Sequence, residues 1–191
     1  MLCGEEMKKI VLMAVVIAVV VVAVVVVLFV HGSTSTSVKL QNITSGELAP
    51  NYEFLIANGS SANLTSYRGH VTVLWFVATW CSSCAQGNEE LNQNYQFFRE
   101  HGIKVVELEL YRNLGYSGPD IASFVYSYAP TAYANSTIIP AQAGYNMTVS
   151  YDPKGYLDIY YLVSSSGKVL YVNSSLGSTL GQLEHAINVS E

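Results

Sequence analysis

Two cysteines, Cys81 and Cys84, have the type and spacing that most directly predict chemistry in this chain. Only Ser82 and Ser83 separate them. Two thiols at this spacing can close a small disulfide ring and exchange it with the disulfides of other molecules. A strand pattern precedes Cys81 and a helical pattern follows it, so we expect the first sulfur at a helix N-terminus. Backbone N–H groups and the helix dipole favour a thiolate there, and the pair therefore indicates thiol-disulfide exchange.

A purely structural disulfide is the alternative, because oxidising compartments favour such bonds. A ring with only two residues between its cysteines restricts little of the unfolded chain, so it adds little stability by loop closure. This argument favours redox chemistry, with Cys81 as the exposed nucleophile and Cys84 as the less exposed thiol that resolves the intermediate into a Cys81–Cys84 disulfide. Trp80 is predicted to contact substrates beside the disulfide, or else to be an ordinary packing residue.

The segments around the cysteines predict an α/β domain. Residues 71–77 form an almost unbroken apolar run, which is typical of a central strand buried on both faces. Residues 82–100 have the apolar spacing of one long helix. Helical crossovers followed by a terminal hairpin predict a mixed central sheet flanked by helices on both faces. The other expected elements are an edge strand within 49–54, strands at 103–110, 159–163 and 169–172, and helices at 121–128 and 176–189, whereas residues 129–155 have no clear pattern.

The segment Ile10–Val30 contains 21 apolar residues and no charge. At 1.5 Å per residue, a helix of this length covers the roughly 30 Å hydrocarbon core of a bilayer. Lys8 and Lys9 precede it and predict a cytoplasmic N-terminus, with the rest of the chain outside the membrane. A cleaved signal peptide is the alternative, but its apolar stretch is shorter and ends in small residues, unlike Phe29–Gly32. The predicted organisation of this single-pass cell-membrane protein is a cytoplasmic N-terminus at 1–9, a transmembrane anchor at 10–30, a flexible linker at 31–47 and an extracytoplasmic domain at 48–191.

Seven Asn-x-Ser/Thr triplets follow the apolar segment, and none precedes it. Such triplets accept N-linked glycans in proteins outside the cell, so they support an extracytoplasmic glycoprotein. Chance matches in a chain rich in Ser, Thr and Asn are the alternative. The candidate sites are Asn42, Asn58, Asn63, Asn135, Asn146, Asn173 and Asn188.

The charge pattern limits the kinds of partner. The formal net charge is −5, and the Lys and Arg residues form no basic patch. This pattern argues against nucleic acid as a partner. No motif indicates a cofactor, so we expect the cysteine pair itself to be the reactive group.

Over roughly 48–189, these motifs together resemble the thioredoxin superfamily and its membrane-anchored TlpA/ResA-like branch. The resemblance implies a thioredoxin-like fold and a thiol-disulfide oxidoreductase that acts on protein thiols and disulfides outside the cell. It favours a reductant over an oxidant, and an external reductant needs a separate electron donor in the membrane. The matching segments are Ala49-Pro50, Leu64 to His70, Val73 to Cys84 (VLWFVATWCSSC), Tyr161 to Val163 and Gly167 to Val169.

Three positions depart from the family pattern. Members of the family carry a cis-proline before the strand at 159–163, whereas Asp158, or less plausibly Leu157, stands at that place here. We expect a trans bond, because a cis bond before a non-proline residue costs about 2.5–4 kcal/mol. Trp75 replaces a buried carboxylate and Gly87 replaces a glutamate, so the usual proton acceptors are missing. Asp158 is a candidate substitute for them, and a solvated loop aspartate is the alternative.

A copper-delivery module that uses Cys81 and Cys84 is the second hypothesis, because thiolates suit Cu(I). Related thioredoxin-fold proteins of the Sco type add a histidine ligand and space their cysteines by three residues. The four histidines of this chain are predicted to lie away from the pair, and Met147 stays open as a ligand because its region has no clear pattern. A surface protein that kept the fold and lost the activity is a third reading. The histidines are His31, His70, His101 and His185.

Overall fold

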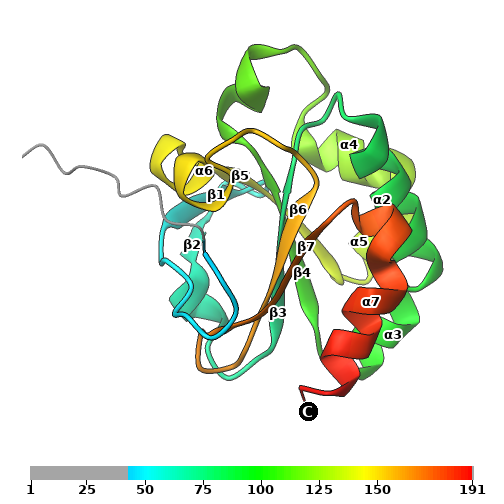
Figure 1. Cartoon of the computed structure of the whole chain (residues 1–191). Coiled ribbons are helices and arrows are strands. Elements are labelled where there is room, and N and C mark those ends of the chain that lie inside the picture. Colours follow the sequence, from blue (N-terminus) through cyan, green and yellow to red (C-terminus); the bar gives the residue numbers. More distant parts are fainter. Residues whose placement is uncertain (1–42, 191) are drawn as a thin grey trace, which may run out of the picture. The chain divides into compact units, whose positions relative to one another are not determined.

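The computed structural model describes residues 43–190, whose arrangement is drawn in Figure 1. The predicted cytoplasmic end, the anchor at 10–30, most of the linker and Asn42 lie outside the described residues. Within 43–190, no helix combines the length and the apolar character needed to cross a bilayer. The elements are β1 (Glu53–Ile56), β2 (Ser61–Asn63), the 3₁₀ helix η1 (Leu64–Tyr67), β3 (Thr72–Val77), α2 (Ser82–Gln93), α3 (Tyr95–Glu100), β4 (Lys104–Glu109), the 3₁₀ helix η2 (Tyr111–Gly115), α4 (Ile121–Tyr128), α5 (Pro130–Ala134), β5 (Ile138–Ala143), α6 (Tyr145–Tyr151), β6 (Ile159–Val163), β7 (Val169–Ser174) and α7 (Leu176–Asn188).

The strands of the described residues form one mixed sheet in the order β2-β1-β5-β4-β3-β6-β7. The three central strands β5, β4 and β3 are parallel. The outer pairs, β2 with β1 on one side and β6 with β7 on the other, are antiparallel. Figure 1 shows α2, α4, α5 and α7 on one face of the sheet and α6 on the other face. The predicted mixed sheet with flanking helices is therefore confirmed.

Side chains alternate along β3 and enter two apolar cores. All six residues of β3 are buried, as the unbroken apolar run predicts. Trp75 packs in the core that lies under the helices and includes Cys84. Leu74 and Phe76 pack in the core on the other face, together with Met147 of α6. The redox pair thus belongs to the helix-covered core.

Three expectations about the elements are wrong in detail. β1 is not an edge strand, because the short strand β2 pairs with its outer side. The helix expected over 82–100 is divided into α2 and α3 at Asn94, whose φ of −106° and ψ of 14° interrupt it. The region without a clear pattern contains β5, an inner strand that includes Pro140. Because proline rarely occurs in inner strands, this residue hid the strand from sequence analysis.

Residues 43–47, which the sequence places in the linker, contact the edge strand β7. The N–H of Gly46 donates to the carbonyl of Val169 at 2.8 Å, and the N–H of Val169 donates to the carbonyl of Glu47 at 2.8 Å. These bonds cover part of the outer edge of the sheet, which would otherwise expose unpaired backbone groups. Two residues of the predicted linker, Gly46 and Glu47, therefore hydrogen-bond to the sheet.

Candidate redox site

Cys81 and Cys84 lie at the junction of β3 and α2, as the sequence predicts, and a disulfide joins them. Cys81 is the N-cap residue of α2, and its sulfur accepts the backbone N–H of Cys84 at 3.2 Å. Cys81 is 7% exposed, whereas Cys84 is fully buried. The hydroxyl of Ser83 lies 3.2 Å from the Cys81 sulfur. This order of exposure is the one expected for a nucleophile followed by a resolving thiol.

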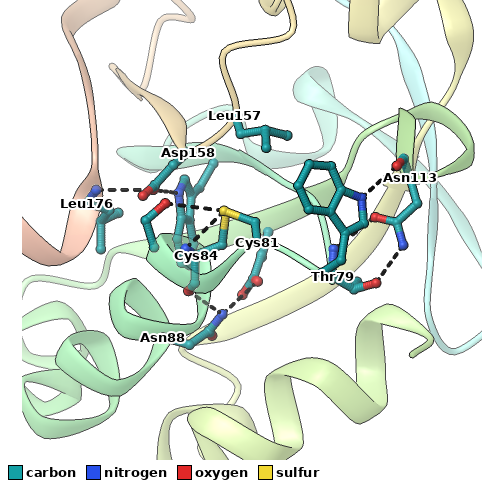
Figure 2. The surroundings of a disulfide bond; sticks show 12 residues. Thr79, Cys81, Cys84, Asn88, Asn113, Leu157, Asp158 and Leu176 are labelled. Atoms are coloured by element: carbon teal, nitrogen blue, oxygen red, sulfur yellow. Dashed lines mark hydrogen bonds between the residues drawn. A yellow bond between two sulfur atoms is a disulfide. The ribbon is translucent and has the colours of Figure 1, made fainter. Parts of the chain in front are cut away.

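Trp80 is held beside the pair by a loop that sequence analysis did not single out. Its side chain is 41% exposed, and its ring packs on Tyr116 at a centroid distance of 4.8 Å. Trp80 Nε1 donates to the carbonyl of Asn113 at 2.8 Å. Asn113 Oδ1 accepts the N–H of Thr79 at 2.9 Å, and Asn113 Nδ2 donates to Thr79 Oγ1 at 2.6 Å (Figure 2). The exposed ring can contact a substrate, and Asn113 fixes both the ring and the start of the cysteine loop.

The backbone around Asn113 is left-handed over three consecutive residues. The φ angles of Arg112, Asn113 and Leu114 are 51°, 55° and 56°. Asn adopts this conformation more readily than most residues other than glycine. Such a run persists only where surrounding contacts hold it, and the bonds from Asn113 to Thr79 and Trp80 do so here. The Asn-Leu-Gly sequence was the available signal, because Asn and Gly favour turns.

The loop before β6 faces the redox pair without a cis-proline. All peptide bonds in 43–190 are trans, as expected for the bond before Asp158. Leu157 and Asp158 both have left-handed backbone, with φ of 62° and 52°. These two residues and Ser83 line one cavity of about 320 Å³ beside the disulfide. A left-handed pair of residues thus stands where the family pattern has its cis-proline.

Asp158 is buried, so its alternative reading as a solvated loop aspartate is wrong. Asp158 Oδ1 accepts the indole N–H of Trp75 at 2.8 Å and the backbone N–H of Leu176 at 3.1 Å. Leu176 is the first residue of α7, and a negative charge at a helix N-terminus is favourable. Figure 2 shows Asp158 between Leu176 and the cysteines. The carboxylate therefore joins β3, the loop before β6 and α7, while a role in proton transfer stays a prediction.

A second buried carboxyl group lies under α2, at a position that sequence analysis missed. Glu107 on β4 is fully buried and pairs in register with Trp75 on β3. Glu107 Oε1 accepts Asn88 Nδ2 at 2.8 Å, and the same Nδ2 lies 3.3 Å from the carbonyl of Cys84. Burial raises the pKa of Glu107 from its ordinary value of 4.5 to about 8, the Asn88 hydrogen bond opposes this rise, and the charge of Asp158 adds to it. A buried carboxyl group is therefore present under α2, at a position other than the two that carry one in the family pattern.

The pattern of β4 contained a signal for Glu107. Val105 and Glu107 are two residues apart on β4, so their side chains point to the same face of the sheet. Because β4 lies between two other strands, that face is covered. Val105 packs in the core under the helices. Because Glu107 points to the same side as this valine, its side chain could not be solvated. The alternation of apolar and charged residues in the sequence had suggested a solvated side chain instead.

Of the candidate copper ligands, His31 lies outside the described residues, and those within 43–190 are not brought to the two sulfurs. His70 precedes β3 and His101 precedes β4, at the end of these parallel strands opposite to Cys81, and a strand of this length spans about 20 Å. His185 lies about 14 Å along α7 from its N-terminus. Met147 is buried in the core on the other face of the sheet. Among the residues that the structure describes, no group of three or more His, Cys, Asp or Glu side chains could hold a metal ion.

Comparison with sequence families gives one match over most of the domain. Residues 45–166 match the sequence profile of the AhpC/TSA family, and this range is more than half of the chain. Among curated proteins, the thiol-disulfide oxidoreductase ResA of Bacillus subtilis is 28% identical over 88 residues, which are 46% of this chain and 47% of ResA. The chain therefore matches about half the length of this relative.

Solved structures with the same fold support this likeness. A thioredoxin-like protein from Aeropyrum pernix has a TM-score of 0.57 and 24% identity, over 73% of this chain and 89% of that chain. The thioredoxin domain of a thiol-disulfide oxidoreductase from Bacteroides vulgatus has a TM-score of 0.54 and 16% identity, over 74% of this chain and 99% of that domain. At such identities the likeness shows the fold, which is thioredoxin-like, as the sequence resemblance implies.

Proposed function

Because this chain belongs to the AhpC/TSA family, we propose that it is a thiol-disulfide oxidoreductase with Cys81 and Cys84 as its redox centre. The observation that carries the proposal is the place of the disulfide, at the N-terminus of α2, with Cys81 slightly exposed and Cys84 fully buried. A two-residue ring adds little stability, so exchange is the better reason for its presence. The similarity to ResA over about half of its length supports the same class of activity.

The reductive half of the exchange starts at Cys81. Its thiolate attacks one sulfur of a substrate disulfide, so that the substrate S–S bond breaks, a mixed disulfide forms and one substrate sulfur leaves as a thiolate. Cys84 then loses its proton and attacks the Cys81 sulfur. The Cys81–Cys84 bond forms, the second substrate sulfur leaves, and two electrons have passed from the cysteine pair to the substrate. The N–H of Cys84 next to the Cys81 sulfur favours the attacking thiolate.

We place this chemistry outside the cytoplasm, in a domain tethered to the cell membrane. The apolar segment at 10–30 and the seven glycan acceptor triplets support this location. The partners would be external protein thiols and disulfides, and the exposed Trp80 ring and the cavity beside Ser83 offer them contact surfaces. We further propose a reductant, as the resemblance to the TlpA/ResA-like branch implies, and such a reductant would receive its electrons from a membrane donor.

Trapping of the mixed disulfide tests the exchange directly. The full-length protein would carry Cys3→Ser, so that Cys81 and Cys84 are its only cysteines. With a disulfide-linked peptide as substrate, the further variant Cys84→Ser should accumulate a peptide adduct on Cys81, seen as an increase in mass. The matched variant Cys81→Ser should form much less adduct, because Cys84 is buried. Equal labelling of both variants, or none of either, would exclude the proposed order of attack.

The direction of electron flow requires the reduction potential of the pair. Equilibration with glutathione or dithiol buffers, followed by alkylation and mass analysis, measures it. A value near about −270 mV, as in thioredoxin, supports a reductant, and a value near about −120 mV, as in DsbA, supports an oxidant. A pair without a reversible couple that binds Cu(I) tightly would support the copper-delivery alternative instead.

A further inference from the structure

Glu107 is a buried titratable group that takes no part in the exchange steps described above. Its side chain is fully buried under α2, beside Trp75 in the sheet. One oxygen, Oε1, accepts a hydrogen bond from Asn88 at 2.8 Å. The other oxygen, Oε2, is buried and has no hydrogen-bond partner within 43–190. An ionised carboxylate in this place would be poorly compensated, so the group is suited to hold a proton and release it.

Asn88 connects this carboxyl group to the second cysteine. It lies one helical turn after Cys84, on the same face of α2. Its side-chain N–H₂ group donates to Glu107 Oε1 at 2.8 Å and lies 3.3 Å from the carbonyl oxygen of Cys84. Figure 2 shows Asn88 below Cys84, with dashed lines from its nitrogen to two oxygen atoms. The fully buried resolving cysteine and the buried acid therefore belong to one small polar group under the start of α2.

Burial and the neighbouring charged group place the pKa of Glu107 close to neutral pH. Its pKa is raised to about 8 mainly by burial, and the negative charge of Asp158 from the loop before β6 contributes to this rise. Tyr160 of β6 faces the same layer next to Trp75, but its hydroxyl is bound to Thr179. Cys84 of α2 is the group whose proton changes during exchange. An acid that titrates near neutral pH and is linked through Asn88 to the backbone of such a residue is suited to proton transfer.

We propose that Glu107 takes up the proton of Cys84 when Cys84 resolves a mixed disulfide, and returns it when the pair is reduced. The inference rests on the proposed function. In the resolving step the Cys84 S–H bond breaks and its proton goes to the Glu107 carboxylate. The Cys84 sulfur then attacks Cys81, the Cys81–Cys84 bond forms, and the substrate thiolate leaves. In the reverse step a donor thiolate attacks Cys81, the Cys81–Cys84 bond breaks, and the leaving Cys84 sulfur takes the proton back from Glu107.

The proposal predicts a particular pH dependence of the resolving step. Only ionised Glu107 can accept the proton, so the rate should rise about tenfold per pH unit below the pKa of Glu107 and level off above about pH 8. Without this acceptor, the rate should follow the ionisation of Cys84 itself. An ordinary thiol titrates at about 8.5, so the break in the profile should move to higher pH.

The test uses full-length protein with Cys3→Ser and a mixed disulfide formed between Cys81 and a chromogenic aromatic thiol. Rapid mixing from low pH to values between about 6 and 10 follows the release of that thiol by Cys84. Glu107→Gln should resolve at least tenfold more slowly at pH 8 and should shift the break upward. Glu109→Gln is the matched control, because Glu109 lies two residues along the same strand and is only half-buried. A Glu107→Gln profile that coincides with that of the parent protein would overturn the proposal.

A second measurement does not depend on the folding of a variant. Carbon-13 NMR of the Glu107 carboxyl group in the oxidised parent protein should give a titration midpoint near 8, and a midpoint below about 5, the range of an ordinary carboxyl group, would overturn the proposal. Failure of the proposed function looks different, because the parent protein would then release no aromatic thiol at any pH. That result would overturn both proposals, whereas normal release with an unchanged variant profile would overturn only the role of Glu107.

Discussion

The indole ring of Trp75 occupies the space that a side chain at position 87 would need. A Cβ atom on Gly87 would lie 2.7 Å from Trp75 Cζ2 and 2.9 Å from Cη2. The two departures from the family pattern, a tryptophan for a buried carboxylate and a glycine for a glutamate, are therefore one packing arrangement. At its other end the same ring donates to Asp158. An aromatic side chain thus connects α2 with the loop before β6 under the redox pair.

Gly87→Ala should lower the free energy of unfolding by about 1–3 kcal/mol, because the added methyl group would overlap the Trp75 ring in a packed core. This loss should exceed the gain of about 1 kcal/mol from the better helix propensity of alanine. Gly181→Ala in α7 is the matched control, since nothing lies within 4 Å of its added Cβ. That control should gain about 0.5–1 kcal/mol. Urea unfolding of the full-length protein measures both, and stabilisation by Gly87→Ala would contradict the tight contact.

Asp158→Ala should destabilise the protein by about 2–5 kcal/mol, because the buried N–H groups of Trp75 and Leu176 would lose their acceptor. Asp158→Asn keeps an oxygen at the same place and should lose clearly less. Chemical denaturation of the two variants side by side measures the difference. Equal losses would mean that the charge of Asp158, and not its role as an acceptor, holds the loop.

Asn113→Gly should lower the free energy of unfolding by about 1–3 kcal/mol and slow disulfide exchange. The glycine keeps the left-handed backbone but removes both side-chain bonds to Thr79. Arg112→Gly is the control, because Arg112 has the same backbone conformation and an exposed side chain. Relief of its left-handed strain should leave stability unchanged or raised by about 1 kcal/mol. The measurements are unfolding curves and the rate of peptide disulfide reduction, and a rate unchanged in Asn113→Gly would show that exchange does not depend on the side-chain bonds to Thr79.

The stability of the oxidised protein should fall as pH rises from about 4.5 to about 8. Burial raises the pKa of Glu107 from 4.5 to about 8, so the folded state holds more protons than the unfolded state in this window. The free energy of unfolding then decreases by up to about 1.4 kcal/mol for each pH unit. Glu107→Gln should remove this component, and Glu109→Gln should retain it. Urea unfolding at pH 5, 6.5 and 8 measures the slope, and parallel slopes for the parent protein and Glu107→Gln would contradict an acid that stays protonated in the fold.

Glycan occupancy should differ between the predicted acceptor sites. Asn58 and Asn146 are exposed. The amide nitrogen of Asn173 instead donates to Tyr171 at 2.8 Å and to Gln182 at 2.9 Å, beside the cavity at the redox pair. We expect glycans at the first two sites and none at Asn173. Glycopeptide mass spectrometry of the protein from its natural host measures this, and a glycan on Asn173 would refute the distinction.

Local patterns were sufficient for the elements that carry the cysteines. The apolar run at 71–77 became β3, and the helix start after Cys81 was confirmed, because periodicity and capping depend on residues close in sequence. The helix break at Asn94 and the inner strand β5 were not found. For β5 the deciding factor is its pairing with the distant strands β1 and β4.

The sequence by itself determined a reactive cysteine pair at a strand–helix junction in an α/β fold, because spacing and flanking periodicity are local properties. Only the tertiary structure decided which polar side chains meet below that pair. Trp75, Asn88, Glu107 and Asp158 come from three elements and a loop that are distant in sequence. Whether a carboxyl group is solvated, bound at a helix end or buried with an unpaired oxygen depends on what packs over it. Long-range packing therefore separates Asp158, which joins two backbone segments and a tryptophan through hydrogen bonds, from Glu107, whose pKa is raised by burial.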